Sequence, residues 1–319
     1  MNGPARPRGP NARTVRVSTV TETDMLESGA PWGQACVTPL GRFPFSAQLV
    51  EIDLGDMVLE IGRNRPVAVV GRLAAGCAGL LMPLEGYGRL ILGGRIAEPE
   101  FIAVCGPGAA FEGASRGRVA WASLTLKTAA VGSLFPPARS AILRPGHFGV
   151  LRVNPVAWQR AITVIRQVEP VARDQPEVFE VPEARRSLRS SVLEMAHELL
   201  AGPHEAPPSR PVALATVRQR LLIHAAVQAV QADPAHLRGE ASLAAALGIS
   251  ALRVRRAFAT ILGVSPSRYL LLRRLVMVRT ALHAAHPPLE ALARAHGFPR
   301  FDRFLRCYAE VFGDVPSHT

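Results

Sequence analysis

Two stretches in the C-terminal third decide the fold of this chain: residues 243–258 read LAAALGISALRVRRAF, and residues 292–308 read LARAHGFPRFDRFLRCY. Each predicts a short apolar helix, a turn glycine, a hydrophobic residue and a second helix that carries arginines. The turn glycines, Gly248 and Gly297, are 49 residues apart. Each stretch is typical of a helix-turn-helix unit, whose second helix can enter the major groove of DNA. The sequence therefore predicts DNA binding through two such units.

The second helix of the first unit has two distinct faces. One stripe at helical spacing is apolar, and we expect it to face the core: Val254, Ala257, Phe258 and Ile261. The opposite side displays the candidate DNA contacts: Leu252, Arg253, Arg255 and Arg256. Ser250 precedes this helix and is both its expected N-cap and a further candidate contact. Arginine suits base reading because its planar fork can bind guanine O6 and N7 together, while Leu252 suits a thymine methyl.

The second unit repeats this arrangement with different residues. Its expected buried stripe is Phe304, Cys307, Tyr308 and Val311. The candidate DNA contacts are Arg300, Phe301, Asp302, Arg303 and Arg306. Phe301 falls between the two faces, so that a half-buried position is favoured over an apolar contact with DNA. Asp302 can accept a hydrogen bond from cytosine N4, but orienting Arg303 or Arg306 is the favoured role.

Helices outside the two recognition helices are expected to hold the units in place. A long helix at about residues 214–231 precedes the first unit, and Ser242 is the expected cap of the helix that ends at Gly248. Ser265 and Pro266 are expected to begin another long helix that fixes the separation of the units. Arg273 and Arg274 on that helix are expected near phosphate or in solvent. For any single arginine a solvated surface position is the alternative, although it explains the whole set poorly.

The charge distribution supports a polyanionic partner. The net charge is +12, and residues 210–319 contain 15 arginines, no lysine and six acidic residues, a balance of +9. Residues 1–209 therefore contribute only +3. A preference for arginine codons explains why arginine replaces lysine, but not why acidic residues are scarce only towards the C-terminus. Such asymmetry favours binding to nucleic acid.

Residues 215–319 resemble the DNA-binding domain of AraC/XylS-type transcriptional regulators. The resemblance covers about a third of the chain and is specific, because both units, their spacing and the phrase after each recognition helix agree. The matching residues are Leu243, Ala246, Gly248, Ser250, Val254, Arg256, Phe258, Gly263-Val264-Ser265-Pro266, Tyr269, Ala293, Gly297-Phe298, Phe304, Tyr308, Phe312-Gly313 and Pro316.

This resemblance implies a seven-helix domain whose two recognition helices lie in successive major-groove segments on one face of DNA. It places the base-reading positions at Leu252, Arg255 and Arg256 and at Phe301, Asp302 and Arg306. Double-stranded promoter DNA, RNA polymerase, a small-molecule effector and a second copy of the chain are the implied partners. Phe301-Asp302-Arg303 departs from the small polar residues of many members, so this helix has no sequence preference that can be carried over.

The remaining chain predicts an α+β multidomain protein with a mainly β, cupin-like N-terminal domain and an all-α C-terminal domain with two helix-turn-helix units. Glycine and proline punctuate short apolar runs in the first half, which is typical of an antiparallel sandwich or barrel. We expect a disordered basic arm at 1–20, a β-rich sensor or dimerisation domain at 21–150, a helical linker at 151–212 and the DNA-binding domain at 213–319. Within that domain the units are expected at about 241–262 and about 289–312.

A second class of function is a cupin-type β-barrel enzyme with a basic helical appendage, and a third is a nonspecific architectural DNA-binding protein. Residues 1–190 contain a single histidine, His147, so a multi-histidine metal centre cannot form there. The chain has no G-x-S-x-G motif and no cysteine with neighbours that mark it as reactive. We therefore expect no catalytic residue, metal ligand or cofactor, and the sequence does not identify effector-binding residues.

The cysteine pattern and hydropathy favour a cytoplasmic protein. The cysteines, Cys36, Cys77, Cys105 and Cys307, are widely spaced and form no C-x-x-C motif, which fits a reducing compartment. No apolar run is long enough to span a membrane, and the proline-rich start lacks the apolar core of a signal peptide.

Overall fold

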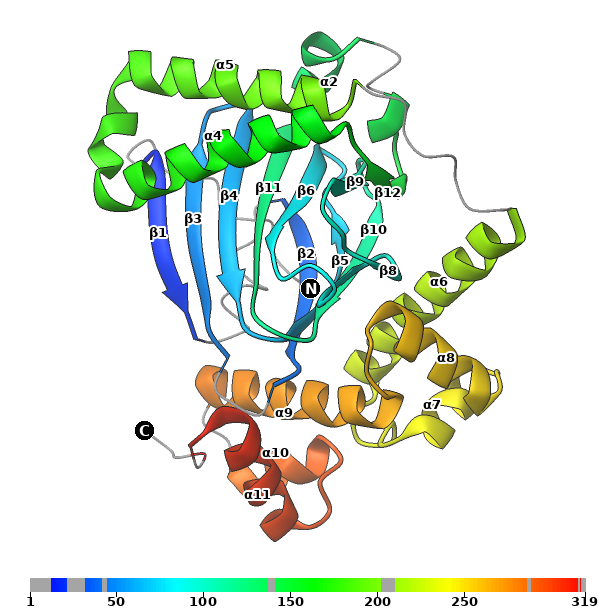
Figure 1. Cartoon of the computed structure of the whole chain (residues 1–319). Helices are drawn as coiled ribbons and strands as arrows, with labels where there is room; N and C mark the ends of the chain where they lie inside the picture. Colours follow the sequence, from blue (N-terminus) through cyan, green and yellow to red (C-terminus); the bar gives the residue numbers. More distant parts are fainter. Residues whose placement is uncertain are drawn as a thin grey trace.

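The computed structural model describes residues 13–21, 32–41, 45–136, 141–201, 210–285, 288–314 and 316. The described parts of residues 15–152 form two antiparallel sheets with twelve strands, and the described chain beyond Arg152 is mainly helical. Figure 1 shows helices α4 and α5 across one face of the β domain, with the C-terminal helices beside and below the strands. The predicted fold class, an N-terminal β domain followed by an all-α domain, is confirmed.

The larger sheet has seven strands in the order β1-β3-β4-β11-β6-β9-β12. Successive side chains of a strand point to opposite faces of the sheet. The apolar side chains of one strand therefore pack against apolar layers on both faces. In β11, for example, Ala122, Leu124 and Leu126 are buried in the main core. The strand bounds are β1 Val15–Val20, β3 Ala47–Asp53, β4 Met57–Asn64, β11 Val119–Lys127, β6 Cys77–Glu85, β9 Phe101–Cys105 and β12 Phe148–Arg152.

The smaller sheet has five strands in the order β2-β5-β10-β7-β8. One of its faces shares small apolar clusters with the larger sheet, including Val37 with Ala47 and Leu92 with Ala103. Its other face lies against the C-terminal domain, as Ala68 and Val70 share a cluster with helical residues. The strand bounds are β2 Gly33–Pro39, β5 Val67–Leu73, β10 Ala110–Ser115, β7 Leu90–Leu92 and β8 Arg95–Ile96.

A layer of helices covers the larger sheet and corrects the expected linker at 151–212. Helices α4 (Pro155–Asp174) and α5 (Pro182–Leu199), joined by the 3₁₀ helix η2 (Pro176–Glu180), bury apolar stripes against the sheet in one continuous core. Their stripes fit the sheet because each helix presents apolar residues at three- and four-residue spacing. These helices therefore belong to the N-terminal domain. The short helices α2 (Thr128–Leu134) and η1 (Ala141–Leu143) lie before β12.

The expected basic arm at 1–20 is wrong for its last six residues, which form strand β1. This strand pairs with β3 along its whole length, from Val15 opposite Ile52 to Val20 opposite Ala47. Thr14 ties its start to the helical layer, because the backbone N–H and the hydroxyl of Thr14 both donate to the Glu180 carboxylate, at 2.8 and 2.9 Å. Residues 1–12 lie outside the described residues.

The C-terminal domain contains two helical clusters linked by one long helix. The first cluster holds Val254 and Phe258, the second holds Phe304 and Tyr308, and α9 contributes buried residues to both. None of the described helices combines the length and apolarity needed to cross a membrane. The helix bounds are α6 Arg210–Ala232, α7 Glu240–Ala246, α8 Ala251–Ile261, α9 Pro266–Ala285, α10 Leu289–Ala295 and α11 Phe301–Phe312.

Candidate nucleic-acid interface

The first helix-turn-helix unit consists of α7, a turn at Gly248, and α8. Gly248 has a φ of +64°, a left-handed conformation that glycine adopts without a steric penalty. The N–H of Ile249 then donates to the Ala244 carbonyl at 3.0 Å and closes the turn. Ser250 is at the N-cap position of α8, but its side chain makes no capping hydrogen bond. Ser242 lies inside α7 and its hydroxyl accepts from the N–H of Gly239, so the predicted cap at Ser242 is wrong and Gly239 is the N-cap.

Helix α8 separates a buried face from an exposed face as its periodicity predicts. Val254, Ala257, Phe258 and Ile261 have no exposed surface. The edge of the Phe258 ring meets Tyr269 of α9, with ring centroids 5.4 Å apart. The predicted reading face is open to solvent: Leu252, Arg253, Arg255 and Arg256 are all exposed. Leu252 is 50% exposed, which leaves it available to a partner.

One arginine of this face has an acidic partner that the sequence analysis missed. Arg255 donates from Nε and Nη2 to the two carboxylate oxygens of Glu240, at 3.1 and 2.7 Å. This hydrogen-bonded pairing raises the pKa of Arg255. Glu240 is the first residue of α7 and lies 15 residues before Arg255 in the sequence. The two residues are on different helices, so the periodicity of the sequence does not predict their contact. Arg255 is therefore pre-oriented on the surface by the first helix of its own unit.

The second unit repeats the geometry with α10, a turn at Gly297, and α11. Gly297 has a φ of +80°, and the N–H of Phe298 donates to the Ala293 carbonyl at 3.0 Å. Four aromatic rings contact one another in a row along α11, in the order Phe301, Phe304, Tyr308 and Phe312. Phe301 is half-buried at the end of this row, which agrees with the favoured alternative. Cys307 is only partly buried, in contrast to Phe304, Tyr308 and Val311.

The exposed face of α11 contains a small ion-pair network. The Asp302 carboxylate accepts from Arg300 at 3.0 Å and lies 3.6 Å from Nη2 of Arg306. The Arg300 hydrogen bond is the main reason why the pKa of Asp302 is lowered. Arg303 is exposed beside this network. The structure thus pairs Asp302 with Arg300 and Arg306, whereas the favoured sequence prediction named Arg303 or Arg306.

Helix α9 departs from prediction at Arg273 and Arg274, which are 4% and 5% exposed and thus neither solvated nor available to phosphate. Arg273 donates to the Val37 carbonyl of strand β2 at 3.4 Å. Arg274 donates to the Gly297 carbonyl at 2.9 Å and lies 4.8 Å from the centre of the Phe298 ring. Burial lowers the pKa of Arg274 to about 10. These two neighbours therefore connect α9 to the β domain and to the second unit.

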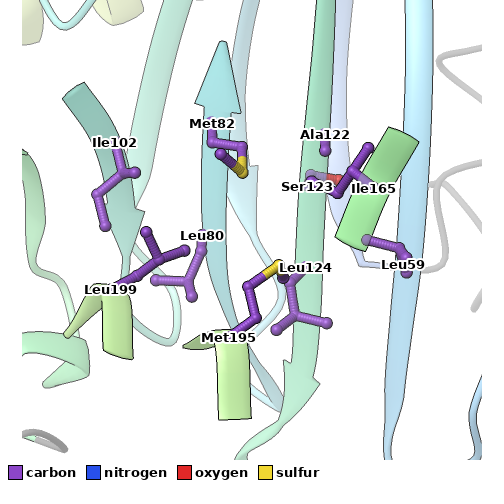
Figure 2. A pocket seen from close by; sticks show the side chains of 10 residues that line it. All are labelled: Leu59, Leu80, Met82, Ile102, Ala122, Ser123, Leu124, Ile165, Met195 and Leu199. Carbon is purple, nitrogen blue, oxygen red and sulfur yellow. The ribbon is translucent and has the colours of Figure 1, made fainter. Parts of the chain in front are cut away.

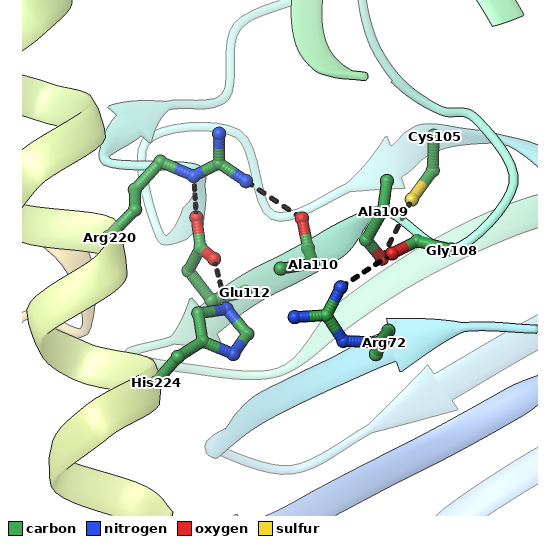
Figure 3. A network of polar contacts seen from close by, with 8 residues as sticks. All are labelled: Arg72, Cys105, Gly108, Ala109, Ala110, Glu112, Arg220 and His224. Atoms are coloured by element: carbon green, nitrogen blue, oxygen red, sulfur yellow. Dashed lines mark hydrogen bonds and ion pairs between the residues drawn. The ribbon is translucent and has the colours of Figure 1, made fainter. Parts of the chain in front are cut away.

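Helix α6, which shares an apolar core with α8 of the first unit, is attached to the smaller sheet by a buried carboxylate. Glu112 of β10 has no exposed side-chain surface, and one of its oxygens accepts from Nε of Arg220 on α6. The other oxygen lies 2.8 Å from Nε2 of His224, one helical turn further along α6. Arg220 also donates to the Ala110 carbonyl at 2.8 Å and stacks over the Phe148 ring at 4.1 Å. Figure 3 shows Arg220 and His224 reaching from α6 towards Glu112.

The N-terminal domain contains a small cavity between the larger sheet and helices α4 and α5 (Figure 2). Nine of its ten lining residues are apolar, with Met82, Met195 and Leu199 among them, and Ser123 is the exception. The free space is about 10 Å³, on the order of one water molecule, which is far below the size of a ligand pocket. Among the described residues no group of three or more histidine, cysteine or acidic side chains is arranged to hold a metal ion.

A comparison with known protein families agrees with this geometry. Residues 243–319 match the family model described as a helix-turn-helix domain. Solved structures similar to the chain include the AraC-like transcriptional activator CuxR, with 14% identity over 85% of this chain and 95% of CuxR, and a TM-score of 0.40. ToxT from Vibrio cholerae has 12% identity over 89% of this chain and 96% of ToxT, with a TM-score of 0.28. No curated protein matches the chain.

Two open recognition helices, each following a glycine turn, and the family match together define the class of protein. The chain is a DNA-binding protein of the helix-turn-helix class. Its C-terminal helix-turn-helix domain is of the AraC type, as the sequence resemblance predicts.

Proposed function

We propose that the chain reads promoter DNA with the exposed faces of α8 and α11, and that its N-terminal β domain controls this binding. The observation that carries the proposal is the exposure of Arg253, Arg255 and Arg256 on α8 and of Arg303 and Arg306 on α11, opposite fully packed apolar stripes. Arginines held on rigid helices can read base edges, because the helix fixes the position of each guanidinium group.

The two units are proposed to contribute differently. On α8, Arg253 and Arg256 project without a described carboxylate neighbour, and only Arg255 is paired. On α11, Asp302 neutralises part of the positive charge of Arg300 and Arg306. We therefore assign the stronger electrostatic attraction for phosphate to the first unit, and a more directional base contact to the second unit.

Control by the N-terminal domain is supported by its direct contact with the first unit. The buried Glu112 contact and the shared apolar cluster mean that a change in the smaller sheet reaches α6 and α8 without an intervening flexible segment. The control signal is proposed to be a small-molecule effector or the formation of a homodimer, and RNA polymerase is the proposed further partner. We infer that the chain acts by binding, with no reaction of its own, in the cytoplasm where its DNA target lies.

The test is binding of the full chain to a duplex that contains the region upstream of its own gene, followed by a footprint. Binding should weaken steeply with salt, with a slope of log K against log salt of about −5 if roughly 6 phosphates are neutralised. Arg256→Ala or Arg306→Ala should cost about 1–3 kcal/mol at the preferred site when the residue makes a bidentate base contact. Equal losses on the preferred and on a scrambled duplex would show that the residue contacts phosphate, and the absence of any preferred site would refute promoter recognition.

A further inference from the structure

Three arginines of the N-terminal domain form a compact surface, which we call the N-terminal arginine cluster: Arg89, Arg116 and Arg118. Arg116 and Arg118 flank Gly117 in the turn between β10 and β11, and Arg89 directly precedes β7. The N–H of Arg116 donates to the Arg89 carbonyl at 2.8 Å, and a methyl group at Gly117 would lie 2.9 Å from Cδ of Arg89. The backbone positions of the three arginines therefore lie side by side at one turn of the β domain.

The N-terminal arginine cluster is exposed and its charge is not compensated locally. All three side chains are exposed. Within the described part of the chain no aspartate or glutamate forms an ion pair with any of them. Three neighbouring cations repel one another, so a fixed patch of this kind is stabilised by an anionic partner.

The cluster lies beside the first recognition helix. A methyl group at Gly263, two residues after the end of α8, would lie 2.6 Å from Nε and 2.8 Å from Nη2 of Arg116. In the neighbouring β7–β8 turn, a methyl group at Gly94 would lie 2.8 Å from Cδ1 of Ile261 and 3.6 Å from Cγ2 of Thr260. Figure 1 shows β8 close to α6 and above α8. The β domain thus touches the C-terminal end of α8 directly.

The side of α8 that meets the β domain also carries one of the candidate DNA contacts. Thr260 follows Arg253 by seven residues, which is close to two helical turns, so both lie on the same flank of the helix. Phosphates line both walls of a major groove that contains a helix, and arginine on the flank of such a helix can contact them. The DNA backbone that passes the Arg253 side of α8 therefore continues towards Gly94 and Arg116 of the β domain.

We propose that the N-terminal arginine cluster binds backbone phosphates of the same duplex that α8 reads. The N-terminal domain then forms part of the DNA interface and adds affinity that does not depend on base sequence. The inference rests on DNA binding by α8, since that helix brings the duplex to the cluster.

The experiment uses the full chain with Arg89, Arg116 and Arg118 all changed to alanine. Its affinity is measured on a duplex from the region upstream of its own gene and on a scrambled duplex, over about 50 to 300 mM salt. Each lost phosphate contact reduces the magnitude of the salt slope by about 0.9, so we expect this magnitude to decrease by about 2–3. The affinity should then fall by about 1,000-fold at 50 mM salt, and this loss should shrink as the salt concentration rises. The fold-loss should be the same on both duplexes.

Two controls separate phosphate binding from damage to the fold. The matched control is Arg16→Ala, since Arg16 is exposed on β1, the edge strand of the larger sheet, and its slope should equal that of the parent chain. A variant with lysine at all three cluster positions keeps the point charges and should recover most of the slope. An alanine variant that keeps the parent slope, or that binds DNA more tightly, would overturn the inference. Failure of the proposed function would appear separately, as an Arg256→Ala variant that keeps its preference for the upstream duplex.

Discussion

Replacing Glu112 by glutamine tests how firmly the first helix-turn-helix unit is held against the β domain. The substitution preserves the shape of the side chain but removes the charge that faces Arg220 and His224. Those two side chains are only 15% and 18% exposed, so water replaces the lost partner poorly. Breaking a buried ion pair by removing one partner costs about 3–5 kcal/mol. Arg220 keeps the Ala110 carbonyl and the Phe148 ring, so we expect a value at the lower end, about 3 kcal/mol.

The position of the tryptophans allows the two domains to be followed separately during unfolding. Trp32, Trp121 and Trp158 are the three tryptophans of the chain, and all lie in the N-terminal domain. Tryptophan fluorescence therefore reports the β domain, whereas far-ultraviolet circular dichroism is dominated by the helices of both domains. We expect coincident urea transitions in the parent chain. In Glu112→Gln the helical transition, which is the one followed by circular dichroism, should move to a urea concentration about 1.5 M lower, for an m-value of about 2 kcal/mol per molar.

A matched substitution and a double-mutant cycle identify the cause of this shift. Glu98→Gln removes a carboxylate that is 57% exposed and paired with Arg152, and should cost less than about 1 kcal/mol. Combining Glu112→Gln with Arg220→Gln measures the coupling between the two side chains. If Glu112→Gln shifts the helical transition no more than Glu98→Gln does, or if the coupling is zero, the buried contact does not hold the domains together.

Three further predictions follow from individual contacts. Gly297→Ala forces a side chain into a left-handed backbone with φ +80° and against a guanidinium 2.7 Å away, so it should lower stability by about 1–3 kcal/mol; Gly76→Ala, which meets no atom within 4 Å, should change the melting temperature little. Asp56→Asn removes a carboxylate whose pKa is lowered by the hydrogen bond from Arg189 on α5, and should lower the free energy of unfolding by about 1 kcal/mol at pH 7. This loss should disappear as the pH falls below the usual pKa of 3.8 and through the lowered pKa of Asp56. Urea midpoints of the parent and the variant that differ by the same amount at pH 7 and at the acidic end would contradict the prediction. Glu240→Gln removes the acid beside Arg255 and should steepen the salt slope of DNA binding by up to about 0.9, with an unchanged slope as the contrary result.

The recognition helices were predictable because their determinants are local. A stripe at 3.6-residue spacing fixes which side of α8 is buried, and the burial of Val254 and Phe258 and the exposure of Arg256 follow from it. The same reasoning failed for Arg273 and Arg274, since an arginine on a helix is ordinarily solvated. Their burial depends on carbonyl groups of Val37 and Gly297, which are brought to α9 by packing of segments distant in sequence.

The N-terminal domain shows the same limit at the level of whole elements. The rhythm of glycine and proline predicts strands, but not which strands pair or what covers them. Half of the residues of β1 are valine, but they follow a basic, proline-rich segment whose composition favours disorder, and pairing with β3 supplies the stabilisation that the sequence does not reveal. Likewise α5 has the predicted stripe of Leu188, Val192, Met195 and Leu199, yet only the sheet beneath it shows that the stripe serves the N-terminal core.

Strand β1 also affects how this protein can be shortened for experiments. The basic, proline-rich start suggests a truncation that removes residues 1–20. The truncated chain would lose the outermost strand and both hydrogen bonds from Thr14 to Glu180. The backbone of β3 would then be left open along seven residues, a ready template for pairing with another molecule. Aggregation of such a truncated protein would result from this exposed strand edge, and would not indicate a defect in the DNA-binding domain.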